Sequence, residues 1–172
     1  AIDYAVEVEA GYIHLVSGIT AGAASFDTLC LNIDYALESL KNTKIEVIIE
    51  PINTGSVPGY FMSSPQIALD VVTAVDSERL GIMFDCFHIL HITGSKTSLL
   101  EAYSLLQKKV RHIQFAAFPN RNEPNHNPFP YPALFDSFIA NGYDGYFGAE
   151  YQPTGSTLRS LDWMKEYQAF LY

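Results

Sequence analysis

The chain has 172 residues, long enough for one domain with a hydrophobic core but short for a complete eight-stranded βα barrel of roughly 250 residues. Hydrophobic residues make up 48% of the chain and charged residues 17%, as in a globular protein and unlike a disordered one. The net charge of −9 argues against a nucleic-acid partner, because phosphates are bound by Lys and Arg.

The sequence also bears on the cellular compartment. No apolar run approaches the ~18 residues of a membrane span, and no segment resembles a signal peptide, so we expect no membrane association. The two cysteines, Cys30 and Cys86, show no pairing pattern, which favours a reduced, cytoplasmic protein. The chain starts at Ala1 within a stretch expected to be helical, a start that suggests a truncation.

Strand-length apolar runs alternate with amphipathic, helix-length segments along the chain. We expect strands over residues 12–17, 45–50, 80–85, 110–116 and 143–150. We expect helices over residues 1–8, 26–40, 64–75, 96–108, 132–141 and 157–171. This alternation predicts an α/β fold of the TIM (β/α)8-barrel type, here an incomplete barrel in a single domain over residues 1–172.

Four of the expected strands end at a residue that can bind a hard metal ion. These residues are Glu50, Asp85, Gln114 and Glu150. Reactive side chains of βα barrels lie at the C-terminal ends of the strands, so we expect the four to converge. Carboxylate and amide oxygens suit Mg²⁺ or Mn²⁺ better than Zn²⁺, and three carboxylates would repel one another without a cation. One such carboxylate is as often a local cap or ion pair, but the recurrence predicts a metalloenzyme.

Three other side chains are candidates for binding a substrate. His88 lies three residues beyond Asp85, where an imidazole can hydrogen-bond a substrate oxygen or orient a ligand, or can simply be satisfied by backbone. Arg121 lies in the long polar loop after the fourth strand and can hold a carboxylate, although an exposed loop arginine is more often solvated. His14 lies within the first strand, where the alternation of side chains can direct it into the barrel.

The remaining histidines and the single tryptophan suggest structural roles. His112 and Gln114 are two residues apart and share a face of the sheet, so a buried supporting role suits His112 better than ligation. We interpret His91 and His126 as ordinary polar positions, and Trp163 as a packing residue between the last helix and the barrel.

Longer motifs surround the strand-end residues. They occupy residues 49–54 with 58–61, 85–88, 112–116 with 119–124, and 142–153. In these motifs the chain resembles hydroxypyruvate isomerases, which belong to the xylose-isomerase-like barrels together with ketose 3-epimerases and apurinic endonucleases. The resemblance covers essentially the whole chain and implies that its five strands are the last five of eight. Ketose 3-epimerases carry His where Gln114 stands, so the carboxamide favours the isomerase branch.

The resemblance further implies roles for the candidate residues. It implies that the four strand-end residues hold the metal, that Glu50 and Glu150 are the catalytic acid/base pair, and that His88 and Arg121 contact the substrate. The implied reaction interconverts hydroxypyruvate and tartronate semialdehyde through an enediolate. The residue types suit this chemistry, because a glutamate can remove the proton beside a carbonyl while a metal bears the developing charge.

Two other functions remain open from the sequence. A ketose 3-epimerase, or another aldose–ketose isomerase, would use the same metal and the same proton transfer. A non-catalytic partial barrel that binds metal weakly, or serves as an interaction module, would explain the missing strands. Five strands cannot close an eight-stranded barrel, so we also expect self-association through the edge strands at 12–17 or 143–150.

Overall fold

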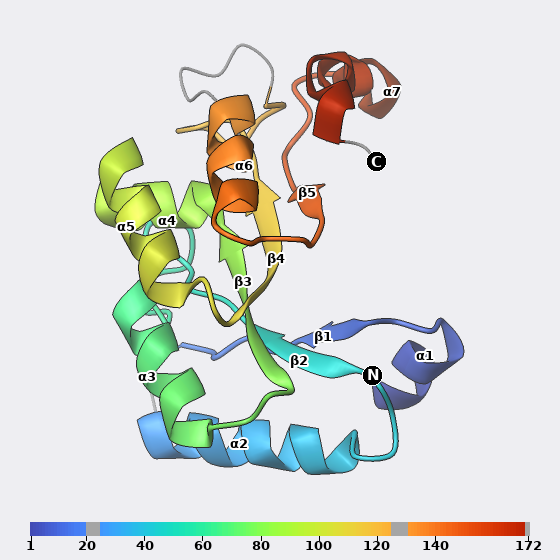
Figure 1. The fold of residues 1–172 in the computed structure, drawn as a ribbon, viewed down its shortest axis with the longest axis vertical. Coiled ribbons are helices and arrows are strands. Elements are labelled where there is room, and N and C mark those ends of the chain that lie inside the picture. Colours follow the sequence, from blue (N-terminus) through green and yellow to red (C-terminus); the bar gives the residue numbers. More distant parts are fainter. Residues whose placement is uncertain (20–24, 125–130, 171–172) are drawn as a thin grey trace.

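The structure is a computed structural model that describes residues 1–19, 25–124 and 131–170. Five parallel strands form one curled sheet whose order follows the chain, β1-β2-β3-β4-β5 (Figure 1). The strands are β1 (Tyr12–His14), β2 (Glu46–Ile49), β3 (Leu80–Asp85), β4 (Val110–Phe115) and β5 (Phe147–Ala149). Because every neighbouring pair of strands is parallel, the C-terminal ends of all the strands lie on the same side of the sheet.

Helices cover the outer side of this sheet (Figure 1). They are α1 (Ile2–Glu7), α2 (Phe26–Ser39), α3 (Pro65–Val75), α4 (Cys86–Thr93), α5 (Lys96–Leu106), α6 (Tyr131–Ala140), the short α7 (Thr157–Ser160) and a 3-10 helix (Leu161–Phe170). Three of them begin with a serine whose hydroxyl accepts a hydrogen bond from a backbone N–H of the first turn: Ser25, Ser64 and Ser95. The curled parallel sheet with outer helices confirms the incomplete βα barrel expected from the sequence.

The core lies between the sheet and the outer helices. Every residue of β3 is buried, as expected for a central strand of a parallel sheet covered on both faces. Phe115 of β4 packs against Phe135 of α6, with ring centroids 4.9 Å apart, and against the Trp163 ring at 5.6 Å. Trp163 is buried, which confirms the packing role expected for it. Among the described residues, no helix is both long enough and apolar enough to cross a membrane.

Several element boundaries differ from the expectation. Residues 86–93 form α4, which was not expected, and residues 157–170 divide into a short α-helix and a 3-10 helix. Strand β5 is only three residues long, and the Tyr143 hydroxyl bonds both to β4 and to the residue just before β5. That hydroxyl accepts a hydrogen bond from the Ile113 N–H (3.0 Å) and donates one to the Tyr146 carbonyl (2.6 Å).

Candidate active site

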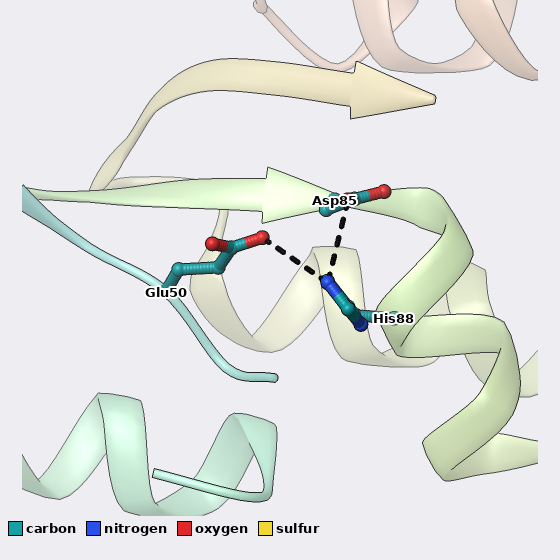
Figure 2. Close-up of side chains that lie close together, drawn as sticks. All are labelled: Glu50, Asp85 and His88. Carbon is teal, nitrogen blue, oxygen red and sulfur yellow. Dashed lines mark ion pairs between the residues drawn. The ribbon is translucent and has the colours of Figure 1, made fainter. Parts of the chain in front are cut away.

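The strand-end residues lie where the parallel topology directs them. Glu50 directly follows β2, and Asp85 is the last residue of β3. Gln114 of β4 is paired in register with Asp85, and Glu150 directly follows β5. Ligand atoms of Glu50, Asp85 and His88 all lie within 4.8 Å of one another (Figure 2).

Glu50 is a buried carboxylate with an incomplete set of partners. The residue is 4% exposed, and among the described residues its Oε1 has no hydrogen-bond partner. Two histidines lie beside it, with His14 Nε2 3.5 Å from Oε2 and His88 Nε2 3.9 Å from Oε1. Burial, together with the negative charges of Asp85 and Glu150, raises the pKa of Glu50 to about 9, and the Arg121 guanidinium opposes this rise less strongly. At neutral pH this carboxyl therefore keeps its proton until a cation approaches.

Asp85 connects the sheet to the loop that carries Arg121. Its Oδ1 accepts a hydrogen bond from the Phe87 N–H at 2.8 Å, which caps the N-terminus of α4. Its Oδ2 accepts one from Arg121 Nη2 at 2.9 Å. Burial raises the pKa of this carboxyl, and the Arg121 charge and the Phe87 hydrogen bond oppose that rise.

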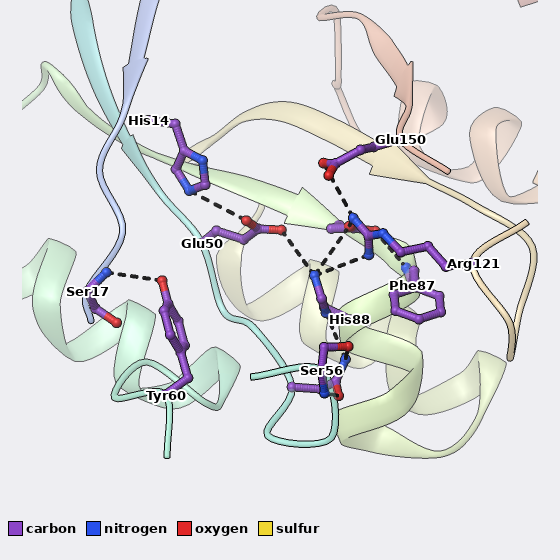
Figure 3. A network of polar contacts seen from close by, with 11 residues as sticks. His14, Ser17, Glu50, Ser56, Tyr60, Phe87, His88, Arg121 and Glu150 are labelled. Carbon is purple, nitrogen blue, oxygen red and sulfur yellow. Dashed lines mark hydrogen bonds and ion pairs between the residues drawn. The ribbon is translucent and has the colours of Figure 1, made fainter. Parts of the chain in front are cut away.

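Arg121 reaches into the site from the loop after β4 (Figure 3). Its backbone has a left-handed φ of 57° and is held at both ends, by its N–H to the Ala117 carbonyl (2.8 Å) and by the Gln152 N–H to its own carbonyl (2.7 Å). The guanidinium lies 4.6 Å from the centre of the Phe87 ring, and Nη2 lies 3.4 Å from Glu150 Oε2. The exposed-arginine alternative is therefore wrong for Arg121, whose side chain is only 17% exposed.

His88 lies in the first turn of α4 and is buried. Burial and the Arg121 charge together lower its pKa to about 3, so the imidazole is neutral at physiological pH. Nε2 faces Arg121 Nη1 at 3.2 Å, while Nδ1 faces the Asn53 side-chain amide at 2.7 Å. Sequence analysis missed Asn53, although it lies three residues beyond Glu50 within one of the motifs singled out above.

The other candidate residues contribute less directly. His14 lies beside Glu50 as described, and burial lowers its pKa while the Glu150 charge opposes this. Burial also lowers the pKa of His112, whose Nε2 would lie only 2.6 Å from a Cβ built at Gly148, so the glycine makes room for this ring. His91 packs against aromatic rings, and His126 lies outside the described residues.

The residues present fit a hard divalent cation. Two buried oxygen atoms, Glu50 Oε1 and Gln114 Oε1, have no hydrogen-bond partner among the described residues. An unpaired buried acceptor costs about 1–3 kcal/mol, and a bound cation would remove that cost. Carboxylate and amide oxygens are the ligands that Mg²⁺ and Mn²⁺ prefer. In the part of the chain that the structure describes, the Arg121 guanidinium is the cationic group that contacts the Asp85 and Glu150 carboxylates.

Comparison with known proteins identifies the family. Residues 1–167 match the family model described as "Xylose isomerase-like TIM barrel". The chain belongs to this family. This membership confirms the barrel type inferred from the sequence.

Relatives within the family carry isomerase names. The chain is 34% identical to "Putative hydroxypyruvate isomerase" of Drosophila melanogaster, over 96% of the chain and 63% of that protein. It is 31% identical to "2-oxo-tetronate isomerase" of Haemophilus influenzae and to "Hydroxypyruvate isomerase" of Escherichia coli, in each case over 98% of the chain and 66% of the relative. These matches confirm the resemblance to hydroxypyruvate isomerases. The chain spans slightly less than two thirds of the length of these curated relatives.

Solved structures agree with this family. A crystal structure titled "AP endonuclease, family 2 from Brucella melitensis" matches with a TM-score of 0.86 and 33% identity, over 96% of this chain and 64% of that one. A D-psicose 3-epimerase from Clostridium cellulolyticum matches with a TM-score of 0.74 but only 16% identity, over 92% of this chain and 56% of that one. The second likeness concerns the fold alone.

Proposed function

We propose that this chain carries the metal-binding and catalytic residues of an isomerase that interconverts hydroxypyruvate and tartronate semialdehyde, or a closely related 2-oxo acid pair. The observation that supports this most is the buried, incompletely paired Glu50 carboxyl, which lies beside Asp85, and Asp85 in turn pairs with the Arg121 guanidinium. Under this proposal, a proton-transferring carboxyl, a hard-metal site and a group for a substrate carboxylate lie within one small volume. The names of the relatives agree with this substrate class.

The metal part of the proposal assigns the cation to the strand ends. The residues that would hold Mg²⁺ or Mn²⁺ are Glu50, Asp85, Gln114 and Glu150. When bound, the ion supplies the positive charge that stabilises an enediolate. His88 also lies within 4.8 Å of the ligand atoms of Glu50 and Asp85.

The catalytic part assigns the proton transfers to Glu50 and Glu150. One glutamate removes a proton from the hydroxymethyl carbon of hydroxypyruvate, and the opposite glutamate returns a proton to the neighbouring carbon, which was the ketone. The hydroxyl proton passes from one oxygen to the other, so the product is an isomer and no co-reactant is needed. Arg121 would bind the substrate carboxylate, and His88 and His14 would contact its oxygens.

Proton exchange in D₂O tests this function directly. The chain is incubated with hydroxypyruvate and Mg²⁺, and ¹H NMR follows both tartronate semialdehyde and the loss of the hydroxymethyl protons to deuterium. We expect both changes, and we expect the Glu150→Gln variant to form no tartronate semialdehyde. A 2-oxo-tetronate and a neutral ketose are assayed in parallel. Preference for the ketose would favour the epimerase alternative, and metal binding without any exchange would favour the non-catalytic partial barrel.

The edges of the sheet support a proposal about assembly. Within the described residues, strands β1 and β5 each pair with a single neighbouring strand, and Tyr12 and Val16 near the first edge are 40% and 60% exposed. We propose that residues 1–172 form one domain that self-associates through these edges. Sedimentation of a stable monomer at high concentration, with slow amide exchange in both edge strands, would contradict it. The small-molecule substrate and the cytoplasmic location remain predictions of the same kind.

A further inference from the structure

Two donor groups approach the ring nitrogens of His88. Asn53 Nδ2 lies 2.7 Å from Nδ1, and Arg121 Nη1 lies 3.2 Å from Nε2. A neutral imidazole offers one acceptor nitrogen, and an imidazolium offers none. At most one of the two contacts can therefore be a hydrogen bond, and the protonated nitrogen depends on which contact it is.

The orientation of the Asn53 amide decides between them. The backbone N–H of Ser56 lies 2.8 Å from Asn53 Oδ1, and because a backbone N–H can only donate, the oxygen of the amide must face it. The NH₂ group then lies on the other side, where it donates to Ser56 Oγ (3.0 Å) and to His88 Nδ1. Asn53 is buried, with 5% of its surface exposed.

Nδ1 of His88 is therefore the acceptor, and Nε2 carries the proton. The shorter of the two contacts supports the same assignment, because two donors at 2.7 Å would repel each other more strongly than two donors at 3.2 Å. The carboxylate oxygens beside Nε2 are Asp85 Oδ2 (3.8 Å) and Glu50 Oε1 (3.9 Å), and both are too far for a hydrogen bond (Figure 2).

This tautomer determines what His88 can do. A protonated Nε2 has no lone pair for a metal ion, so His88 cannot join Glu50 and Asp85 as a ligand through this atom, despite lying within 4.8 Å of them. It also cannot act as a base there. The Nε2–H can donate a hydrogen bond, and an N–H of Arg121 lies beside it. One oxygen atom placed between the two side chains would accept a hydrogen bond from each of them.

We propose that Asn53 is a positioning residue that holds His88 as an Nε2–H donor, so that His88 binds a substrate oxygen and ligates no metal. The tautomer follows from the structure alone, whereas the substrate oxygen rests on the proposed function. Such a donor aimed at an oxygen that gains negative charge is worth about 100-fold in kcat or more.

The tautomer is measured by ¹H–¹⁵N NMR of the histidine rings in the 172-residue chain, in chelator at pH 7, with the His88 signals identified by their loss in a His88→Gln variant. We expect an unprotonated Nδ1 and a protonated Nε2 in His88. We expect the pattern to persist when Mg²⁺ is added, because no ligation through Nε2 occurs. A protonated Nδ1, or loss of the Nε2 proton on adding Mg²⁺, would overturn the proposal.

Two matched variants separate positioning from a merely structural role. Asn53→Asp keeps an oxygen toward the Ser56 N–H but turns the group facing Nδ1 into an acceptor, so we expect Nδ1 to become protonated and kcat for hydroxypyruvate to fall about 100-fold. Ser56→Ala removes only the hydroxyl and leaves the Ser56 N–H in place, so the wild-type tautomer should remain. An unchanged tautomer in Asn53→Asp would also overturn the proposal. If the wild-type chain shows the expected tautomer but no turnover, the proposed function fails and the assignment of His88 stands.

Discussion

The raised pKa of Glu50 predicts that metal binding releases a proton. A carboxyl must be ionised to bind a cation, and with a pKa of about 9 only about one molecule in a hundred has Glu50 ionised at pH 7. The apparent affinity for Mg²⁺ at pH 7 should therefore lie about 100-fold below its value at full ionisation, which corresponds to about 2.7 kcal/mol. Between pH 6.5 and 8 we expect the apparent affinity to rise nearly tenfold per pH unit.

Titration calorimetry in two buffers of different ionisation enthalpy checks this directly, because the difference in heat gives the number of protons released. We expect about one proton per ion at pH 7. The Glu50→Gln variant is the matched control, since its amide oxygen can still face the ion but has no proton to lose. In this variant the affinity should be weaker and nearly independent of pH. A native chain that binds Mg²⁺ with constant affinity from pH 6.5 to 8, without proton release, would refute the reasoning.

Three further predictions concern stability and turnover. In chelator, the free energy of unfolding should fall as pH rises from 6.5 to 9, by at most about 1.4 kcal/mol per pH unit, because folded Glu50 keeps a proton that the unfolded chain has lost. Below pH 6.5 the lowered pKa of His88 changes the free energy of unfolding in the opposite direction. A free energy of unfolding, measured by urea denaturation, that stays constant from pH 6.5 to 9 would contradict the prediction. Glu50→Gln and Glu150→Gln should each abolish turnover, and the double variant should lose little more, since residues that act as one unit are not additive. Arg121→Ala should raise KM for hydroxypyruvate at least tenfold without weakening Mg²⁺ binding; an unchanged KM would remove Arg121 from substrate binding.

Sequence patterns predicted the sheet well where a strand is fully buried. The bounds of β3 match the expectation because an unbroken apolar run bounded by polar residues leaves little choice. Helix α4 was missed because it starts directly at the strand end, where Asp85 was interpreted only as a metal ligand and not also as an N-cap. Gly94, which ends α4 with a φ of 82°, was a usable signal for that helix.

The positions of the candidate site residues were predictable from topology, but their partners were not. Parallel strands in chain order place Glu50, Asp85 and Glu150 at the C-terminal ends of the strands, independently of the loop conformations. The direction of Arg121 depends on a left-handed backbone and on the Phe87 ring, and neither leaves a pattern in the sequence. The contact between Asn53 and His88 joins residues that are 35 positions apart, with α3 and β3 between them, so only the folded chain reveals it.

Arg121 connects the proposed metal and substrate sites. Its single positive charge lies between Asp85 Oδ2 (2.9 Å) and Glu150 Oε2 (3.4 Å), so it partly neutralises two carboxylates that the proposal assigns to the metal. Those carboxylates cannot bind a divalent cation and keep the guanidinium equally close, because the two cations repel each other. Loss of the contact with Asp85 would free N–H groups of Arg121 while its backbone stays held by Ala117 and Gln152. The freed guanidinium is then available to a substrate carboxylate, which is why replacing Arg121 should weaken substrate binding without weakening metal binding.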